Sequence, residues 1–292
     1  MATLIMHPGA PKTATTALQH VLRVNRWRLA WRGVGLILPE DIRDHSFLGD
    51  YLAAYRGSGP SDISQCTAEF FAPYLAKYRT VICSEETLCH DFMPSRKIGL
   101  GGIDRADTAA RLLSHCGAEQ TKVVLSIRPQ VDFLTSTYTH FVHRRRESRP
   151  FSEWLSHEVD LGSVLWSPAV AAFRQQFGVE AVNVVLLADK GGVAGYIKTM
   201  LDHFGLSRFK LKYDVSEIHN PSPSARAVQL CRIMNSQIRN PEKSERVNSA
   251  LIENFPVEEF GKFVPAAGKI PKDLLLVYAA DHAAALSGAV PA

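Results

Sequence analysis

The stretch Thr3-Leu4-Ile5-Met6-His7-Pro8-Gly9-Ala10-Pro11-Lys12-Thr13-Ala14-Thr15-Thr16 decides how the rest of the sequence is interpreted. Its short apolar run predicts a buried strand over Thr3–His7, the small residues that follow predict a tight loop, and the amphipathic pattern that begins at Ala17 predicts a helix. The loop offers one lysine, three threonine hydroxyls and the free N–H groups of a helix start. These groups suit a phosphate or a sulfate, so we predict an anion site where the first strand ends.

Four further apolar segments have the length and composition of buried strands. They are Val34–Leu38, Thr80–Ser84, Lys122–Ile127 and Val182–Leu187. Helical patterns lie between and after them, over Thr15–Trp31, Asp104–Cys116, Val131–Arg145, Phe151–His157, Ser167–Phe177, Val193–Phe204 and Ser222–Asn235. Continuous apolar strands that alternate with helices are typical of a sheet covered on both faces. The sequence therefore predicts a three-layer α/β/α fold with a central, mostly parallel sheet, similar to that of P-loop NTPases.

The domain organisation is expected to be simple, because no repeat, linker or break in composition divides the chain. We predict one α/β domain over residues 1–286, followed by a loose tail over residues 287–292. A less regular, mainly helical segment over residues 42–78 is expected to form an insertion over the edge of the sheet, as a lid or as a wall of a substrate site. The part from about residue 207 onward is also predicted to be mainly helical.

Composition limits the classes of function. The net charge of +4 and a sequence pI near 8.8 agree with an anionic ligand but are too weak to indicate nucleic acid. The five cysteines are scattered without a CxxC or Cys/His spacing, which predicts reduced thiols, no metal site and a cytoplasmic protein. Pro8 and Gly9 interrupt any signal-peptide pattern, and no apolar run is long enough to predict a membrane span.

The opening loop differs from a Walker A loop. That motif reads G-x-x-x-x-G-K-[ST], whereas here Gly9 precedes Lys12 by three positions and Pro11 stands directly before the lysine. The opening segment nevertheless has the same order of elements as a Walker A loop: a strand, a loop, a Lys-Thr pair and a helix. The alternative is an ordinary turn between a strand and a helix, with a threonine that caps the helix.

A second candidate anion site follows the strand Lys122–Ile127. Arg128 stands at the carboxyl end of this strand, where open α/β sheets bind ligands. Ser136 comes eight residues later, about two helical turns on, so it can share a face with the start of the helix. A guanidinium and a hydroxyl placed this way suit a phosphate, although Arg128 could instead pair with a carboxylate such as Asp132.

Together the two motifs resemble the nucleotide-binding signature of sulfotransferases that use 3′-phosphoadenosine 5′-phosphosulfate (PAPS), in particular their bacterial members. In that family a K-[ST]-G-T-T loop holds the 5′-phosphosulfate, and a strand-end Arg with a Ser eight residues later holds the 3′-phosphate. The matching residues here are Lys12, Thr13, Ala14, Thr15 and Thr16, then Arg128 and Ser136. The resemblance spans roughly residues 3–240, and it implies PAPS as co-substrate, PAP as product, and no metal.

One position departs from the family pattern, because Ala14 stands where the family has glycine. If this position has a positive φ, alanine costs on the order of 1 kcal/mol there. A helical or extended φ would remove that cost.

A third motif offers a base for the acceptor proton. Glu85 and Glu86 follow the strand Thr80–Ser84, and relatives of the family place a catalytic glutamate at the end of a similar strand. Glu85 matches that place best, and Glu86 is the neighbour that could take its role. The alternative is that both carboxylates begin a helix and complement its dipole.

Histidines and arginines supply further candidates. His45 lies in the irregular segment expected to face the acceptor and is a rival base, because imidazole titrates near neutral pH. His140 and His143 are weaker candidates. The basic run from His143 to Arg146 is typical of a solvated helix end, but it could also attract an anionic acceptor.

These motifs predict in-line transfer of a sulfuryl group from PAPS to a hydroxyl or amine of a glycan or a small molecule. Lys12 is the expected catalytic cation, and Glu85 or His45 the expected base. Two alternatives are an ATP-dependent kinase, favoured by the loosely Walker B-like run Val184–Asp189, and a non-catalytic nucleotide- or glycan-binding protein. The acceptor and the oligomeric state cannot be inferred from the sequence.

Overall fold

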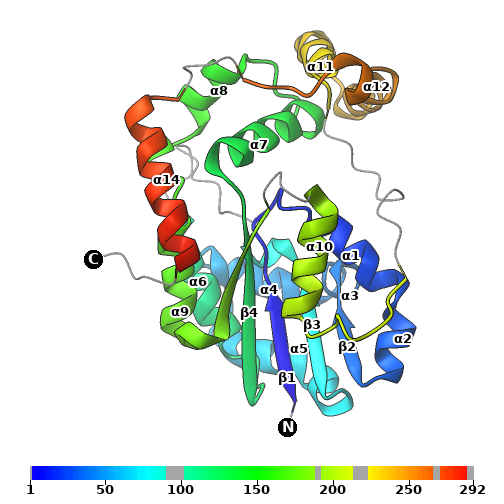
Figure 1. The fold of residues 1–292 in the computed structure, drawn as a ribbon, viewed down its shortest axis with the longest axis vertical. Coiled ribbons are helices and arrows are strands. Elements are labelled where there is room, and N and C mark those ends of the chain that lie inside the picture. Colours follow the sequence, from blue (N-terminus) through cyan, green and yellow to red (C-terminus); the bar gives the residue numbers. More distant parts are fainter. Residues whose placement is uncertain (1, 90–101, 188–191, 213–222, 266–269, 288–292) are drawn as a thin grey trace.

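The sheet at the centre of the computed structural model has five parallel strands in the order β2-β3-β1-β4-β5. The model describes residues 2–89, 102–187, 192–212, 223–265 and 270–287. The strands are β1 (Thr3–His7), β2 (Val34–Ile37), β3 (Thr80–Ser84), β4 (Gln120–Ile127) and β5 (Val182–Leu186). All five predicted strands are present, and the predicted three-layer α/β/α fold is confirmed (Figure 1).

The register of the sheet gathers the strand ends at one edge. His7, the last residue of β1, pairs with Ser84, the last residue of β3. On the other side, Ile127 at the end of β4 pairs with Leu186 of β5. Because the strands are parallel, the segments that follow β1, β3 and β4 all leave the sheet at this carboxyl edge.

One face of the sheet is covered by α1 (Thr15–Val24), α2 (Arg26–Trp31) and α10 (Gly192–His203), which share an apolar cluster with the strands. The sequence predicted α1 and α2 as one helix. They are separate because the buried Asn25 ends α1 and uses its side chain elsewhere. Its amide donates to the carbonyls of Val21 (2.8 Å) and Lys212 (2.6 Å), and its oxygen accepts the N–H of Lys212 (2.9 Å).

The opposite face holds the larger part of the core. It is covered by α4 (Ser46–Tyr55), α5 (Ile63–Lys77), α6 (Gly102–Leu113) and α9 (Ser167–Phe177), preceded by the short α3 (Pro39–Ile42). The expected insertion over residues 42–78 is a helical hairpin within this layer. Its aromatic side chains belong to the core, where Phe47 and Phe70 stack with ring centroids 4.4 Å apart.

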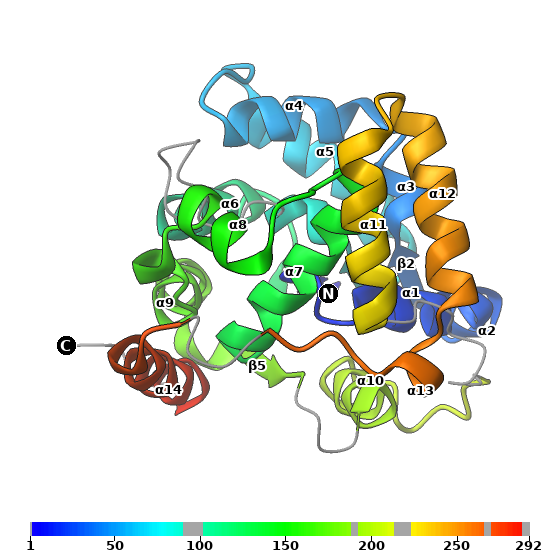
Figure 2. The same cartoon turned by 90° about the horizontal axis from the view of Figure 1, so that it is seen from above.

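A helical cap lies beyond the carboxyl edge of the sheet. Figure 1 shows α7 (Gln130–Arg144), α8 (Phe151–Glu158), α11 (Ala225–Gln237) and α12 (Pro241–Asn254) in this position, and Figure 2 shows α11 and α12 side by side. Asn235 of α11 and Asn248 of α12 both donate to the carbonyl of Val142 in α7, at 2.7 and 3.3 Å. These buried amides hold helices α11 and α12 against α7.

The remaining elements complete the layers. They are α13 (Val257–Phe260), α14 (Lys272–Ser287) and the 3₁₀ segments η1 (Glu86–Cys89), η2 (Leu161–Ser163) and η3 (Val179–Ala181). The chain from residue 207 onward is mainly helical wherever it is described. All five cysteines carry free thiols. Among the described helices, none has the length and apolar character needed to cross a bilayer.

Candidate functional site

The loop after β1 has an unusual backbone. Lys12 (φ 67°) and Ala14 (φ 59°) are left-handed, whereas Thr13 between them is not. Left-handed residues beside right-handed ones are the kind of backbone that can turn successive main-chain N–H groups toward an anion. Ala14 is also the N-cap of α1. The positive φ means that alanine here carries a conformational cost on the order of 1 kcal/mol relative to glycine.

The three threonines of the loop face different surroundings. Thr13 is fully buried and its Oγ1 donates to the carbonyl of Ala10 at 2.6 Å, so its hydroxyl points into the protein. Thr15 is also buried, and Thr16 is exposed. The first N–H groups of a helix have no partner within the helix. The main chain of this segment and the Thr16 hydroxyl are therefore the groups that an anion can meet.

Arg128 brings the second predicted motif to the loop. Its Nη1 donates to the carbonyl of Lys12 at 3.2 Å, across 116 residues of sequence. The main chain of Arg128 is held in turn by Trp166, whose indole N–H donates to the Arg128 carbonyl at 2.7 Å. The backbone N–H groups of Trp166 and Ser167 both donate to the buried Asp281 of α14, at 2.7 and 2.9 Å. A C-terminal helix thus supports the position of Arg128.

The charge of Lys12 is poorly solvated. Burial lowers the pKa of its amine, the nearby Arg128 and Arg144 lower it further, and the carboxylate of Glu86 acts in the opposite direction. A half-buried ammonium beside two guanidinium groups is stabilised by an anion that binds between them. This electrostatic environment agrees with the anion site predicted from the sequence.

Glu85 is the carboxylate that faces inward. It is fully buried and forms a two-point ion pair with Arg43, whose Nε and Nη2 each donate at 2.9 Å. The main-chain N–H and the hydroxyl of Thr87 also donate to it, at 2.8 and 2.5 Å. With four donors around it, Glu85 holds Arg43 and the start of η1 in place.

Glu86 is the carboxylate that stays partly exposed. Its side chain keeps 24% of its surface exposed, and its charge acts on Lys12. Gln19 of α1 donates to Glu86 at 3.1 Å and to the Ser84 carbonyl at 3.0 Å, while Arg43 donates to Glu86 at 3.2 Å. Glu86 is thus the more accessible member of the pair.

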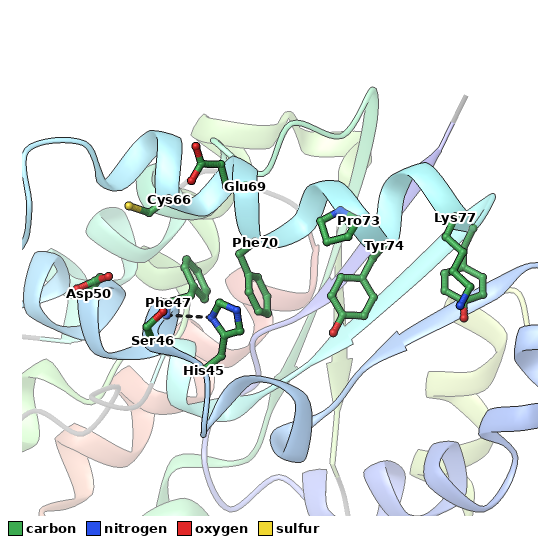
Figure 3. Close-up of a pocket in the computed structure, with 11 residues that line it drawn as sticks. His45, Ser46, Phe47, Asp50, Cys66, Glu69, Phe70, Pro73, Tyr74 and Lys77 are labelled. Atoms are coloured by element: carbon green, nitrogen blue, oxygen red, sulfur yellow. Dashed lines mark hydrogen bonds between the residues drawn. The ribbon is translucent and has the colours of Figure 1, made fainter.

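His45 lies in a different environment. Its Nδ1 accepts the N–H of Phe47 at 3.1 Å as the N-cap of α4, and its ring meets Phe70 edge-on. It lines a cavity of about 500 Å³ beside α4 and α5, together with aromatic side chains such as Tyr74 (Figure 3). No other predicted site residue lines this cavity. Within the described residues, no recorded hydrogen bond or ring contact joins His45 to Lys12 or to either glutamate.

Helix α7 carries the remaining candidates. Ser136 is half-buried on it. Burial lowers the pKa of His140 to about 4, with a further contribution from Lys12, and burial together with Arg144 lowers the pKa of His143. Arg144 forms an ion pair with Glu245 of α12. The basic run at the end of α7 is therefore partly engaged with the helical cap.

Several residues that build the site carried no signal in the sequence. Arg43, Gln19, Trp166 and Asp281 act through contacts with residues far away in the chain. Nothing in the local pattern distinguishes them from ordinary helix residues. His7 lies within the opening motif, where a histidine at the end of an apolar strand is a signal visible in the sequence.

Comparisons with known proteins find little. No protein-family model matches the chain, and no curated protein matches it. Among solved structures, the chain is similar to the crystal structure of a sulfotransferase from Alicyclobacillus acidocaldarius, with 15% sequence identity and a TM-score of 0.44. The match covers 90% of this chain and 97% of the other. We therefore base the proposed function on the residues of this chain.

Proposed function

We propose that the protein is a sulfotransferase, which transfers the sulfuryl group of PAPS to a hydroxyl or an amine of a small-molecule or glycan acceptor. The observation that carries this proposal is the hydrogen bond from Arg128 to the carbonyl of Lys12. It joins the two parts of the PAPS signature at one edge of the sheet. An ordinary turn after β1 would not require such a partner.

The donor would bind along this edge. Lys12, the main chain of residues 13–16 and the Thr16 hydroxyl would hold the 5′-phosphosulfate. Arg128 and Ser136 would hold the 3′-phosphate, which ATP lacks. The lowered pKa of Lys12 supports this assignment, because a bound anion offsets the loss of solvation that lowers it.

Transfer would proceed in line. PAPS supplies an activated sulfuryl group; the acceptor atom bonds to sulfur while the bond from sulfur to the phosphate oxygen breaks. Lys12 and the start of α1 stabilise the charge that develops on the departing phosphate. Glu86 accepts the acceptor proton, and we favour it over Glu85 because it is partly exposed and its charge acts on Lys12. Arg43 and Gln19 orient the Glu86 carboxylate.

The test compares PAP with AMP, which differ only in the 3′-phosphate. PAP is expected to raise the melting temperature far more than AMP, and Arg128→Ala to weaken PAP binding by about ten- to a hundredfold. The same substitution at the exposed Arg111 of α6 serves as the control and should leave the affinity for PAP unchanged. Equal thermal shifts with PAP and AMP would rule out the 3′-phosphate assignment.

Two other outcomes would replace the proposal. Phosphoryl transfer that needs ATP and Mg²⁺, without PAP binding, would favour a kinase. The Asp189 that suggested this alternative lies outside the described residues. Tight PAP binding without transfer to any of a broad panel of acceptors would favour a non-catalytic nucleotide-binding protein.

A further inference from the structure

Helix α2 carries two exposed tryptophans on the outer side of the fold. Trp27 and Trp31 keep 63% and 88% of their surface exposed, whereas Trp154 and Trp166 are buried. Trp27 and Trp31 are four residues apart, so they are neighbours on the helix surface, and Leu29 between them is fully buried in the core. Figures 1 and 2 show α2 at the periphery, away from the helical cap. Two large rings therefore protrude from the protein at this point.

Arginines surround these rings. The guanidinium of Arg28 lies 5.2 Å from the centre of the Trp27 ring. Arg32, directly after α2, lies 4.8 Å from the ring centre of Phe209, and Arg208 lies 5.0 Å from the centre of the same ring. Within the part of the chain that the structure describes, none of these three arginines forms an ion pair with a carboxylate.

The segment 207–212, which follows α10, extends this surface. It is held beside α2 by Asn25, whose amide donates to the Lys212 carbonyl at 2.6 Å and whose oxygen accepts the Lys212 N–H at 2.9 Å. The side chains of Arg208 and Lys210 in this segment are exposed. Two distant parts of the sequence thus build one surface, which we call the basic aromatic patch: Trp27, Arg28, Trp31, Arg32, Arg208 and Lys210.

The carboxylates next to α2 do not cancel this charge. Glu40 is paired with Arg23 at 2.7 Å, and Asp41 is paired with Arg26 at 2.6 Å, so these four groups offset one another. Asp202 of α10 lies beside the segment 207–212, where it accepts a hydrogen bond from a serine. One carboxylate does not offset the four cations of the patch, which therefore stays positive.

We propose that the basic aromatic patch docks the protein on the surface of an anionic lipid bilayer. Indole rings favour the level of the lipid headgroups, where the ring leaves water and its N–H stays hydrated. Arginines and lysines beside the rings attract the phosphates of anionic lipids. A bilayer surface satisfies both kinds of group at once, whereas a small soluble anion would bind the cations and leave both rings in water.

This docking is independent of the proposed function, because no residue of the patch belongs to the donor or the acceptor side of the site. The anion-binding loop leaves the sheet at its carboxyl edge, where the helical cap lies, and α2 lies away from that cap (Figure 1). A protein docked through α2 would therefore keep its anion site open to a donor dissolved in water.

Binding to vesicles tests the proposal with the full chain. The protein is expected to sediment with vesicles of phosphatidylcholine and phosphatidylglycerol, and to bind about tenfold more weakly to phosphatidylcholine alone or at high salt. Phospholipids brominated on their acyl chains should quench the fluorescence of the exposed Trp27 and Trp31, since the other two tryptophans are buried. A lack of binding to the mixed vesicles, or binding without quenching, would overturn the proposal.

Substitutions separate the patch from the rest of the surface. Trp31→Ala is expected to weaken vesicle binding at least about tenfold, and Arg208→Gln about fivefold. The matched controls are Leu276→Ala on α14, at a position 74% exposed, and Arg111→Gln on α6, and both should keep the affinity within about twofold. All four side chains are exposed, so the melting temperature should stay unchanged. Equal vesicle binding by Trp31→Ala and the wild type would overturn the proposal.

Two other partners would give different results, and each would replace the bilayer. A second copy of this chain would appear in light scattering as a dimer that Trp31→Ala dissociates, without vesicle binding. Single-stranded DNA that binds more tightly than the vesicles, with the same dependence on Trp31, would indicate a nucleic-acid surface. A protein that fails to bind PAP would reject the proposed function and leave the vesicle result unaffected.

Discussion

The two sides of the proposed site are built with different interactions. On the donor side, the loop is held by the buried hydrogen bond from Thr13 to the Ala10 carbonyl and by an arginine that donates to a main-chain carbonyl. On the acceptor side, Glu85 and Glu86 are held by Arg43, which is 46% exposed, and the end of α7 is held by an exposed ion pair between Arg144 and Glu245. Salt and substitution weaken exposed ion pairs more readily than buried neutral hydrogen bonds. We therefore expect donor recognition to tolerate less change than acceptor recognition.

The largest effect is expected at Lys12, where the donor side supplies charge. Lys12→Ala should lower kcat by about a thousandfold, because the developing charge on the departing phosphate loses its preorganised cation. Circular dichroism and the unfolding midpoint should stay close to those of the wild type, since this partly buried ammonium contributes little to the fold. Transfer at more than a tenth of the wild-type rate would remove Lys12 from the mechanism.

The next largest effect on kcat is expected at Glu86, the partly exposed glutamate of the acceptor side. Glu86→Gln should lower kcat by about a hundredfold with little change in PAP affinity, because a general base is lost while the shape of the side chain is kept. A near-normal rate would transfer the role of base to another group.

Glu85→Gln is the matched variant for this comparison. It should cost about 1–3 kcal/mol of unfolding free energy in urea, because the charged partner of Arg43 is lost, and it should retain more of the rate than Glu86→Gln. His45→Ala removes the N-cap of α4 and should cost about 1 kcal/mol with little effect on kcat. A rate loss larger in either of these variants than in Glu86→Gln would reverse our assignment of the base.

A smaller effect is expected from pH, through the buried imidazole of His7 and the half-buried imidazole of His140. Burial lowers the pKa of His7 to about 3 and of His140 to about 4, from 6.5 in the unfolded chain. Below pH 6.5 the unfolded chain therefore binds protons that the folded chain does not, so stability is complete above that pH and falls as the pH falls.

Urea unfolding at pH 7 and pH 5 measures this effect. We expect His7 alone to cause a loss of about 2 kcal/mol at pH 5; the half-buried His140 adds a smaller amount, which His140→Gln should remove. Between pH 5 and pH 7 carboxylates are largely ionised, so the change in unfolding free energy reports mainly the protonation of imidazoles. An unfolding free energy that is equal at the two pH values would contradict the burial of both rings in neutral form.

The smallest effect concerns the backbone of the donor loop. Ala14→Gly should stabilise the protein by up to about 1 kcal/mol, because glycine adopts the left-handed conformation without a steric cost. Ala10→Gly is the control within the same loop, at a position without a positive φ, and it should destabilise the protein by about 0.5–1 kcal/mol. The two substitutions are expected to have opposite signs in thermal unfolding, and the same sign in both would contradict the strained conformation of Ala14.

The sequence was informative where function and local structure depend on neighbouring residues. The apolar runs of β1 and β3 predicted both strands with the correct ends, and the alternation of strands with helices predicted the layers. The boundary that failed lies at Asn25, where a side chain bonds to Lys212 and interrupts a helix that the local pattern favours. No window of sequence around Asn25 contains that partner.

In the candidate site, too, some features were predictable from the sequence and others depended on the fold. The apolar residues of β1 and β4 were enough to predict that Lys12 and Arg128 follow strand ends, and parallel strands end at one edge of the sheet. The folded arrangement was needed to show that Glu85 turns inward to Arg43, that Glu86 stays partly exposed, and that His7 lies beside Gly9 of the loop. The direction of a side chain depends on which donors and acceptors surround it, and those come from segments that are adjacent only after the chain has folded.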